Sequence, residues 1–292
     1  MSNHPVYAST AGITRHFSSL AMLLAGLTDA GLDHIELGWS PPLAGLEVPK
    51  GLAAFSANWL VHNYFPAPDQ PFVLNLASQE AVTLRRSREH CLAAIQLSAA
   101  LGAPFYSVHS GFLAGLESET LGGQLDYTEI WDYEQGYTTF LDSLQLLLSA
   151  ANTTNLRLLI EPNVVAPFNL VGGRNLLLML AEPREFTRLL ADLPDPRLGV
   201  LLDLGHLKVT ACTLGFNAVD FVDAVAPALG AFHLHDNNGT ADLHLPVTQD
   251  SWALQVIRQC RFNSLPVINE AKFSTATAMV EHCNWLKQYL NR

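Results

Sequence analysis

The run LGVLLDLG at residues 198–205 has the pattern of a buried β-strand that leads into a polar turn. A short, nearly continuous apolar run of this kind is typical of a strand in a parallel sheet. Seven similar runs occur along the chain: VYAST (6–10), HIELGW (34–39), NWLVHNY (58–64), FYSVHS (105–110), RLLIEP (157–162), AFHLHD (231–236) and PVINEA (266–271). The sequence therefore predicts eight short strands.

Longer amphipathic segments alternate with these runs. The clearest are FSSLAMLLAGLTDAG (17–31), VTLRRSREHCLAAIQLSAALG (82–102), AVDFVDAVAPALG (218–230) and TAMVEHCNWLKQYL (277–290). Several of them stop at a glycine, as helices often do. Strand and helix units that repeat without a low-complexity linker predict an α/β protein, a single (β/α)8 TIM barrel over residues 1–292. An open doubly wound sheet is the main alternative, but no glycine-rich phosphate loop follows the first strand.

Composition excludes several functional classes. The 292 residues are 49% hydrophobic and 15% charged, with a net charge of −11, which favours an acidic soluble enzyme over a polyanion-binding protein. The N-terminal MSNHPVYAST lacks the features of a signal peptide, and no apolar stretch reaches the roughly 18 residues that span a bilayer. We therefore expect a cytoplasmic protein without a membrane partner. The four cysteines form no CxxC pair, and we expect buried reduced thiols at Cys91, Cys212, Cys260 and Cys283.

Polar residues cluster where the predicted strands end. In a TIM barrel these ends meet at one mouth, where the chemistry takes place. The candidates are His62, His109, Glu161, Asp203, His206, His235 and Glu270, followed by Asp242 and His244 in the loop after the seventh strand. A buried carboxylate or imidazole without a partner costs several kcal/mol, and binding of divalent cations would remove that cost for the whole cluster. A single such histidine is more often a core residue, but ligands at six strand ends favour a metal site.

The other histidines receive a structural interpretation. His233 and His235 are two residues apart and face the same way on a strand, so only the outer one needs to reach the mouth. We predict that His235 is a ligand and that His233 is a deeper, hydrogen-bonded neighbour. The remaining histidines lie away from the strand ends: His4, His16, His34, His90 and His282.

Four motifs together resemble the xylose isomerase-like TIM-barrel superfamily. They are IEPN, LLDLGH, HLHDNNGTADLH and INEAK, and the resemblance covers essentially the whole predicted barrel. This superfamily includes sugar phosphate isomerases and epimerases and the endonuclease IV type of AP endonuclease, in AP endonuclease family 2. The resemblance implies a metal-binding quartet of Glu161, Asp203, His235 and Glu270. Both branches share this quartet, so it does not distinguish them.

The endonuclease IV type implies a larger ligand set. His62, His109 and Glu161 would hold a first metal, and Glu161 would bridge to a second metal held by Asp203, His235 and Glu270. His206, Asp242 and His244 would hold a third. Imidazole and carboxylate ligands suit zinc, with up to three ions, or manganese.

Two activities follow from this resemblance. The preferred one is metal-assisted hydrolysis of a phosphoester in a small carbohydrate or phosphorylated carbohydrate, with Glu161, Glu270 and His206 as catalytic residues. The alternative is a single-metal sugar or sugar-phosphate isomerase or epimerase, in which Glu161 and Glu270 transfer the proton and His206 contacts the sugar. A binding module with a structural metal fits less well, because structural zinc sites are closed four-ligand cages.

The segment GFLAGLESETLGGQLDYTEIWDYEQGY (111–137) argues against duplex DNA as a partner. No Lys or Arg occurs between Arg88 and Arg157, and duplex binding depends on cationic side chains. The segment is acidic and contains four aromatic residues: Tyr127, Trp131, Tyr133 and Tyr137. It is either a lid over a small polar ligand or a loop packed on the outer helices. The sequence does not indicate an oligomeric state.

Overall fold

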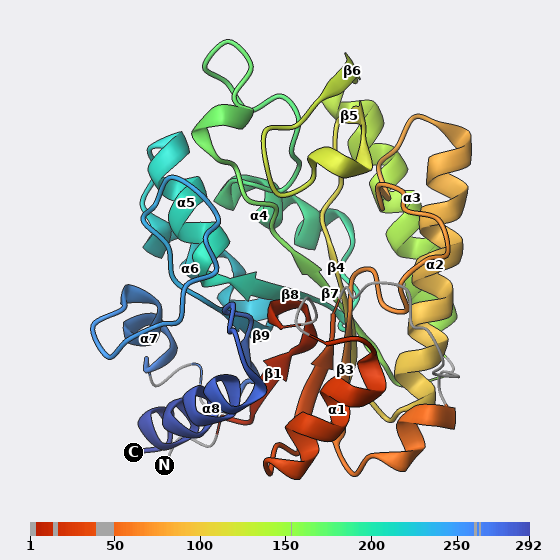
Figure 1. Cartoon of the computed structure of the whole chain (residues 1–292). Helices are drawn as coiled ribbons and strands as arrows, with labels where there is room; N and C mark the ends of the chain where they lie inside the picture. The colour runs from red at the N-terminus through yellow and green to blue at the C-terminus, as the bar shows by residue number, and fades with distance from the viewer. Residues whose placement is uncertain (1–3, 14–16, 39–49, 153, 260–261, 263) are drawn as a thin grey trace.

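The predicted TIM barrel is confirmed. The computed structural model describes residues 4–13, 17–38, 50–152, 154–259, 262 and 264–292. Eight parallel strands close in the order β1-β10-β9-β8-β7-β4-β3-β2 (Figure 1). Their bounds are Val6–Ser9 (β1), His34–Leu37 (β2), Asn58–His62 (β3), Phe105–His109 (β4), Arg157–Glu161 (β7), Leu198–Asp203 (β8), Leu229–Leu234 (β9) and Val267–Asn269 (β10).

Helices surround the barrel (Figure 1). In the described residues they are α1 (Leu20–Asp29), α2 (Ala81–Ala100), α3 (Tyr133–Ala151), α4 (Pro183–Asp192), α5 (Leu204–Leu214), α6 (Ala218–Val225), α7 (Trp252–Ile257) and α8 (Ala276–Leu290). The sequence predicts a strand throughout 198–205, but the strand ends at Asp203 and α5 begins at Leu204. The reason is local: the Asp203 carboxylate accepts a hydrogen bond from the backbone N–H of His206 and caps the new helix.

The barrel interior is filled with side chains. One inward layer consists of Tyr7, Leu60, Phe105, Leu159, Leu201, Ala231 and Ile268. A larger core lies between the strands and the helices, where α1 contributes Leu23, Leu24 and Leu27. Because the interior is closed, polar side chains at the carboxyl ends of the strands face a mouth above a packed floor.

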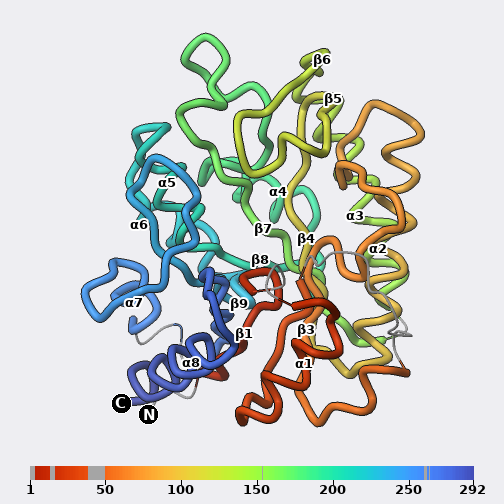
Figure 2. Tube along the Cα trace, in the orientation of Figure 1, coloured from red at the N-terminus to blue at the C-terminus, as the bar shows by residue number. Residues whose placement is uncertain are grey.

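The segment after β4 contains regular structure. Strands β5 (Ala114–Leu116) and β6 (Tyr127–Ile130) pair antiparallel, with the short 3-10 helix η4 (Ser118–Thr120) between them. Figure 2 shows this hairpin rising beside the segment that joins β7 to α4. Tyr133 and Tyr137 belong to α3, where Tyr137 is buried and stacks on Tyr133. The positions of Tyr133 and Tyr137 therefore agree with the alternative in which this part of the segment packs among the outer helices.

The cysteines differ in part from the prediction. Cys91 and Cys283 are free and buried, whereas Cys212 on α5 is free but exposed. Cys260 and His16 lie outside the described residues. Within the described part of the chain, no helix combines the length and apolarity that a membrane crossing needs.

Candidate metal centre

Three strand ends form a first group of possible metal ligands. His62 ends β3, His109 ends β4 and Glu161 ends β7. Glu161 Oε2 lies 3.3 Å from His62 Nε2 and 3.6 Å from His109 Nε2. On its other side, the His62 ring is fixed by a 3.0 Å hydrogen bond between Nδ1 and Ser107 Oγ. The structure thus brings together the three residues predicted for the first metal.

The second group contains His233 where His235 was predicted. His233 Nδ1 lies 3.0 Å from Glu270 Oε2, 3.5 Å from Glu161 Oε1 and 3.8 Å from Asp203 Oδ2. One atom from each of these four residues could therefore contact a common ion. His235, the histidine predicted for this quartet, lies 3.1 Å from Asp203 Oδ2 through its Nε2 atom but belongs to a different candidate group.

Strand register explains why His233 belongs to this candidate group. Asp203 is paired with His233 across β8 and β9, so these two side chains stand at the same level of the barrel. His235 lies two residues further on, past the end of β9 at Leu234. Strand alternation predicted that only the outer histidine, His235, reaches the mouth. In the structure the inner one, His233, is level with Asp203, and His235 belongs to a different candidate group.

Glu36 was not predicted as part of the site. This carboxylate on β2 is fully buried and accepts a 2.9 Å hydrogen bond from His233 Nε2. It could also share an ion with His62 and His233. Because the hydrogen bond occupies Nε2 and leaves Nδ1 facing three carboxylates, we interpret Glu36 as the residue that orients His233. The signal in the sequence was an acidic residue inside the apolar run HIELGW.

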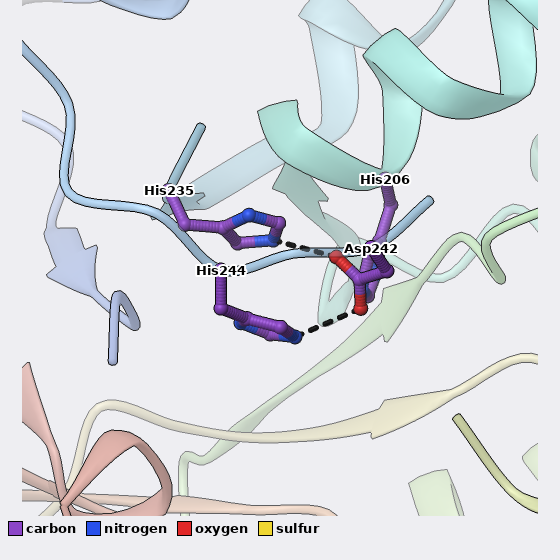
Figure 3. A group of neighbouring side chains, drawn as sticks. All are labelled: His206, His235, Asp242 and His244. Carbon is purple, nitrogen blue, oxygen red and sulfur yellow. Dashed lines mark ion pairs between the residues drawn. The ribbon is translucent and has the colours of Figure 1, made fainter. Parts of the chain in front are cut away.

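The third group lies beside the second and combines α5 with the loop after β9. Figure 3 shows His206, His235, Asp242 and His244 converging, with the Asp242 carboxylate facing the stacked rings of His235 and His244. Asp242 carboxylate oxygens lie 3.4 Å from His235 Nε2, 2.8 Å from His244 Nε2 and 3.4 Å from His206 Nε2. The structure therefore groups the three residues predicted for the third metal and adds His235.

A loop whose two ends are hydrogen-bonded to each other places Asp242 and His244 in this group. Asp236 and Leu245 exchange two backbone hydrogen bonds of 2.7 and 2.8 Å, which close the intervening residues into a loop. Lys208 also stabilises the start of this loop through a 2.7 Å ion pair with Asp236. The loop therefore turns back over His235.

Gly205 makes room for the ring of His235. A Cβ atom at Gly205 would overlap the imidazole of His235. Gly205 lies in the first turn of α5, next to His206. A larger residue would therefore disturb two members of the third group together.

The electrostatics of the cluster favour a cation. Burial alone raises the pKa of Glu161, but the imidazoles of His109, His233 and His62 outweigh it and hold that pKa well below its usual value. Burial alone lowers the pKa of His233, but Glu36, Glu270 and Glu161 raise it well above its usual value. Several carboxylates are thus held in their anionic form in a buried place, which is the environment that a divalent cation stabilises.

The residues present fit divalent metal ions. Several buried polar atoms face each other without forming a hydrogen bond: both Glu161 oxygens, Asp203 Oδ2, His206 Nδ1, His233 Nδ1, His235 Nε2 and Asp242 Oδ1. Such atoms are costly unless something binds them. Ligand atoms about 2.1 Å from one tetrahedral ion lie about 3.4 Å apart. That spacing agrees with the 3.3 Å between His62 and Glu161 and the 3.4 Å between His206 and Asp242.

A pocket of about 240 Å³ opens in front of the cluster. Members of all three groups line it: His109, His206, Asp242, His244 and Glu270. The segment 111–137 contributes Phe112, Leu121, Gly122, Gly123 and Leu125. The four aromatic residues that the lid alternative would place on a ligand, Tyr127, Trp131, Tyr133 and Tyr137, are not among the lining residues. This segment therefore meets the pocket with an apolar and glycine-rich surface instead.

The histidines given a structural interpretation make structural contacts. His4 Nδ1 pairs with the carbonyl of Leu265, and His90 Nε2 pairs with that of Asn63. His282 Nε2 pairs with the carbonyl of Val247, and His34 Nδ1 pairs with Asp33. None of these four belongs to a candidate ligand group in the described residues.

Comparisons with known proteins agree with this architecture. A family model described as "Xylose isomerase-like TIM barrel" matches residues 24–289. A search of curated protein sequences finds no significant match.

Solved structures share the fold at low identity. A D-tagatose 3-epimerase-like protein superimposes with a TM-score of 0.72 and 18% identity, over 100% of this chain and 97% of that chain. A protein from Thermus thermophilus, soaked with ZnCl2, gives 0.61 and 20%, over 99% and 98%. A family 2 AP endonuclease from Brucella melitensis gives 0.66 and 14%, over 99% of both chains.

Proposed function

Because the chain belongs to the xylose isomerase-like TIM barrel family, we propose that it is a divalent-metal-dependent hydrolase of a phosphoester bond in a small carbohydrate-type substrate. One observation carries the proposal: Glu161 is shared by two candidate ligand groups, and a third group adjoins them. A single-ion isomerase requires only one such group. Two further groups of buried ligands are best explained by chemistry that uses several ions.

The ligand assignment follows the three groups. His62, His109 and Glu161 would hold the first ion; Glu161, Asp203, His233 and Glu270 the second; and His206, His235, Asp242 and His244 the third. Zinc suits this mixture of imidazole and carboxylate, and manganese is the second choice. When bound, such ions polarise a phosphoryl group, lower the pKa of water and neutralise charge on the attacking and leaving oxygens.

The protein's own residues divide into two roles. His109, His206, His244 and Glu270 line the pocket, so this edge of the centre meets the substrate. Behind it, Asp203, His233 and His235 are almost completely buried and contact Glu270 and Asp242 of the pocket edge through His233 and His235. The apolar side of the pocket excludes bulk water around the bound substrate, which strengthens electrostatic interactions there.

A sugar isomerase or epimerase is the second candidate. The group Glu161, Asp203, His233 and Glu270 supports it, because one ion between two glutamates suits proton transfer beside a sugar carbonyl. Against it, Glu161 is fully buried and does not line the pocket, whereas Glu270 does. A proton-transfer pair needs both carboxylates within reach of the substrate.

Two variants separate these functions. His109→Ala and His244→Ala each remove a ligand outside the quartet, so hydrolysis of sugar phosphomonoesters and phosphodiesters by zinc-loaded protein should fall at least about 100-fold. His34→Ala is the matched control, because His34 on β2 pairs with Asp33, away from the ligand groups, and its loss should leave the rate unchanged. Full hydrolysis by both variants would contradict the multinuclear proposal. Ketose epimerisation that both variants retain, without hydrolysis, would favour the second candidate.

A further inference from the structure

The pocket in front of the candidate metal centre is mostly apolar. Its volume of about 240 Å³ exceeds that of a cavity of about 150 Å³ that holds benzene. Away from the ligand groups, its apolar walls consist of Leu74, Phe112, Leu121, Leu125, Val164, Ala166, Phe168 and Leu178. The space and its lining therefore match a group the size of one or two rings with an apolar face.

Within the part of the chain that the structure describes, no lysine or arginine lines the pocket. Among the described residues, its charged members are Asp242 and Glu270, together with the histidines of the centre. A second phosphate or a carboxylate on the substrate would enter the pocket without an arginine or lysine of the described residues to pair with. Since burial of an unpaired charge is costly, the part of the substrate in this pocket is uncharged.

The apolar wall is fixed before any ligand binds. Asn75 clamps Phe112 by accepting from its N–H at 3.0 Å and donating to its carbonyl at 2.9 Å. Asn169 accepts from the N–H of Leu125 and donates to the carbonyl of Gly123. Phe112, Leu125 and Leu178 also belong to one packed cluster outside the main core. A wall held in this way keeps its shape, which reduces the ordering cost of binding.

Outside the ligand groups, one buried polar atom of the lining has no partner among the described residues. The Oδ1 atom of Asn63 is buried and accepts no hydrogen bond. Asn63 lies just past β3, next to His62, and lines the pocket. Because Oδ1 is buried, a substrate donor, a hydroxyl or an amide N–H, would reach this acceptor once the Asn63 side chain turns toward the pocket.

We propose that this pocket binds an uncharged, ring-sized group of the substrate, with an apolar face against Phe112 and Phe168 and a hydrogen-bond donor toward Asn63. The inference rests on the proposed function and narrows it. The substrate carries its only anionic group at the metal centre, and the alcohol released by hydrolysis is neutral and partly apolar.

Hydroxamates test the pocket without requiring turnover. Acetohydroxamate, benzohydroxamate and 4-carboxybenzohydroxamate share one metal-binding group and differ only in their tails. Calorimetric titration of zinc-loaded protein should give a dissociation constant for benzohydroxamate about tenfold lower than for acetohydroxamate, from burial of the ring. The 4-carboxy compound should bind more weakly than benzohydroxamate, because no lysine or arginine among the described lining residues pairs with its charge.

The variant Phe168→Ala tests whether the gain in affinity for benzohydroxamate comes from the apolar wall of this pocket. Phe168 is 43% exposed at the pocket, so the variant should fold normally, and it should weaken benzohydroxamate about fivefold while leaving acetohydroxamate unchanged. Tyr127→Ala is the matched control: this aromatic residue is 38% exposed on β6 and does not line the pocket, so neither ligand should be affected.

Contrary outcomes are distinguishable. Two results with zinc-containing protein would contradict the pocket assignment but not the metal centre. They are equal affinities for acetohydroxamate and benzohydroxamate, and tighter binding of the carboxylated compound than of benzohydroxamate. Elemental analysis of the same samples identifies the other failure. A protein that retains no zinc would contradict the proposed function, and the pocket assignment would fall with it.

Discussion

In the pair Glu36–His233, the carboxylate of Glu36 determines which ring nitrogen of His233 faces the candidate metal site. A histidine with two free ring nitrogens can present either of them to a metal. The 2.9 Å hydrogen bond from Nε2 to the buried Glu36 removes that choice and directs Nδ1 toward Glu161, Asp203 and Glu270. Carboxylates behind histidine ligands fix the ring and raise its basicity in many metal sites.

Glu36→Gln should weaken zinc binding without removing a ligand. Loss of the charge behind His233 is expected to lower zinc affinity about 10- to 100-fold at one site. Competition with a chromophoric chelator measures this change. Glu89→Gln is the control, since Glu89 is exposed and pairs with Arg85 on the surface of α2. Unchanged zinc affinity in a folded Glu36→Gln protein would refute the orienting role.

Gly205→Ala should damage the third group selectively. The added methyl would overlap the His235 ring, so the free energy of unfolding should fall by about 1–3 kcal/mol and one ion should be lost. Gly26→Ala is the helical control, because its Cβ would meet only atoms 3.8 Å away and should stabilise α1 by about 0.5–1 kcal/mol. Denaturant unfolding and zinc stoichiometry report the two effects. Retention of every ion by Gly205→Ala would show that metal binding by the third group does not depend on the space that Gly205 leaves for the His235 ring.

At the scale of elements, Asn75 links the segment before α2 to the segment after β4. Its side chain makes three buried hydrogen bonds, two with Phe112 and one with the N–H of Ala77. Asn75→Ala should therefore lower the free energy of unfolding by about 2–3 kcal/mol and weaken benzohydroxamate binding. Asn58→Ala removes only an exposed contact and should be nearly neutral. A thermal shift assay compares the two variants, and equal midpoints would show that Asn75 does not fix the wall.

The strands were predictable because apolar runs end at polar residues, as at RLLIEP and FYSVHS. The hairpin β5–β6 was not predicted, because the strand Tyr127–Ile130 is exposed and lacks an apolar pattern. In the site, most of the candidate ligands were predicted from strand ends alone. The exchange of His235 for His233 depends on the register between β8 and β9, which one sequence does not reveal.

At the scale of the molecule, the closed barrel brings distant segments to one mouth. Glu161 from β7 contacts residues of β3, β4, α5 and β9. Carboxylates that repel one another at this mouth are expected to oppose folding until cations bind. The metal centre should therefore contribute to the stability of the whole barrel.

Removal of metal should lower the melting temperature. An ion at about 1,000 times its dissociation constant stabilises the native state by about 4 kcal/mol, so EDTA treatment should lower the midpoint by several degrees, and zinc should restore it. The variant His244→Ala should show a smaller shift, because it lacks a ligand of the third group. Identical melting curves with and without EDTA would indicate that the centre binds no ion in the native protein.

The most direct test is the number of ions per chain. Protein purified without chelator is equilibrated with zinc, freed of loosely bound metal by gel filtration and analysed for its elements, beside His244→Ala and His34→Ala. The account predicts three ions per chain for the unchanged protein and for His34→Ala, one in each ligand group, with fewer in His244→Ala. A single ion in all three proteins would contradict the multinuclear centre and leave only the quartet around His233.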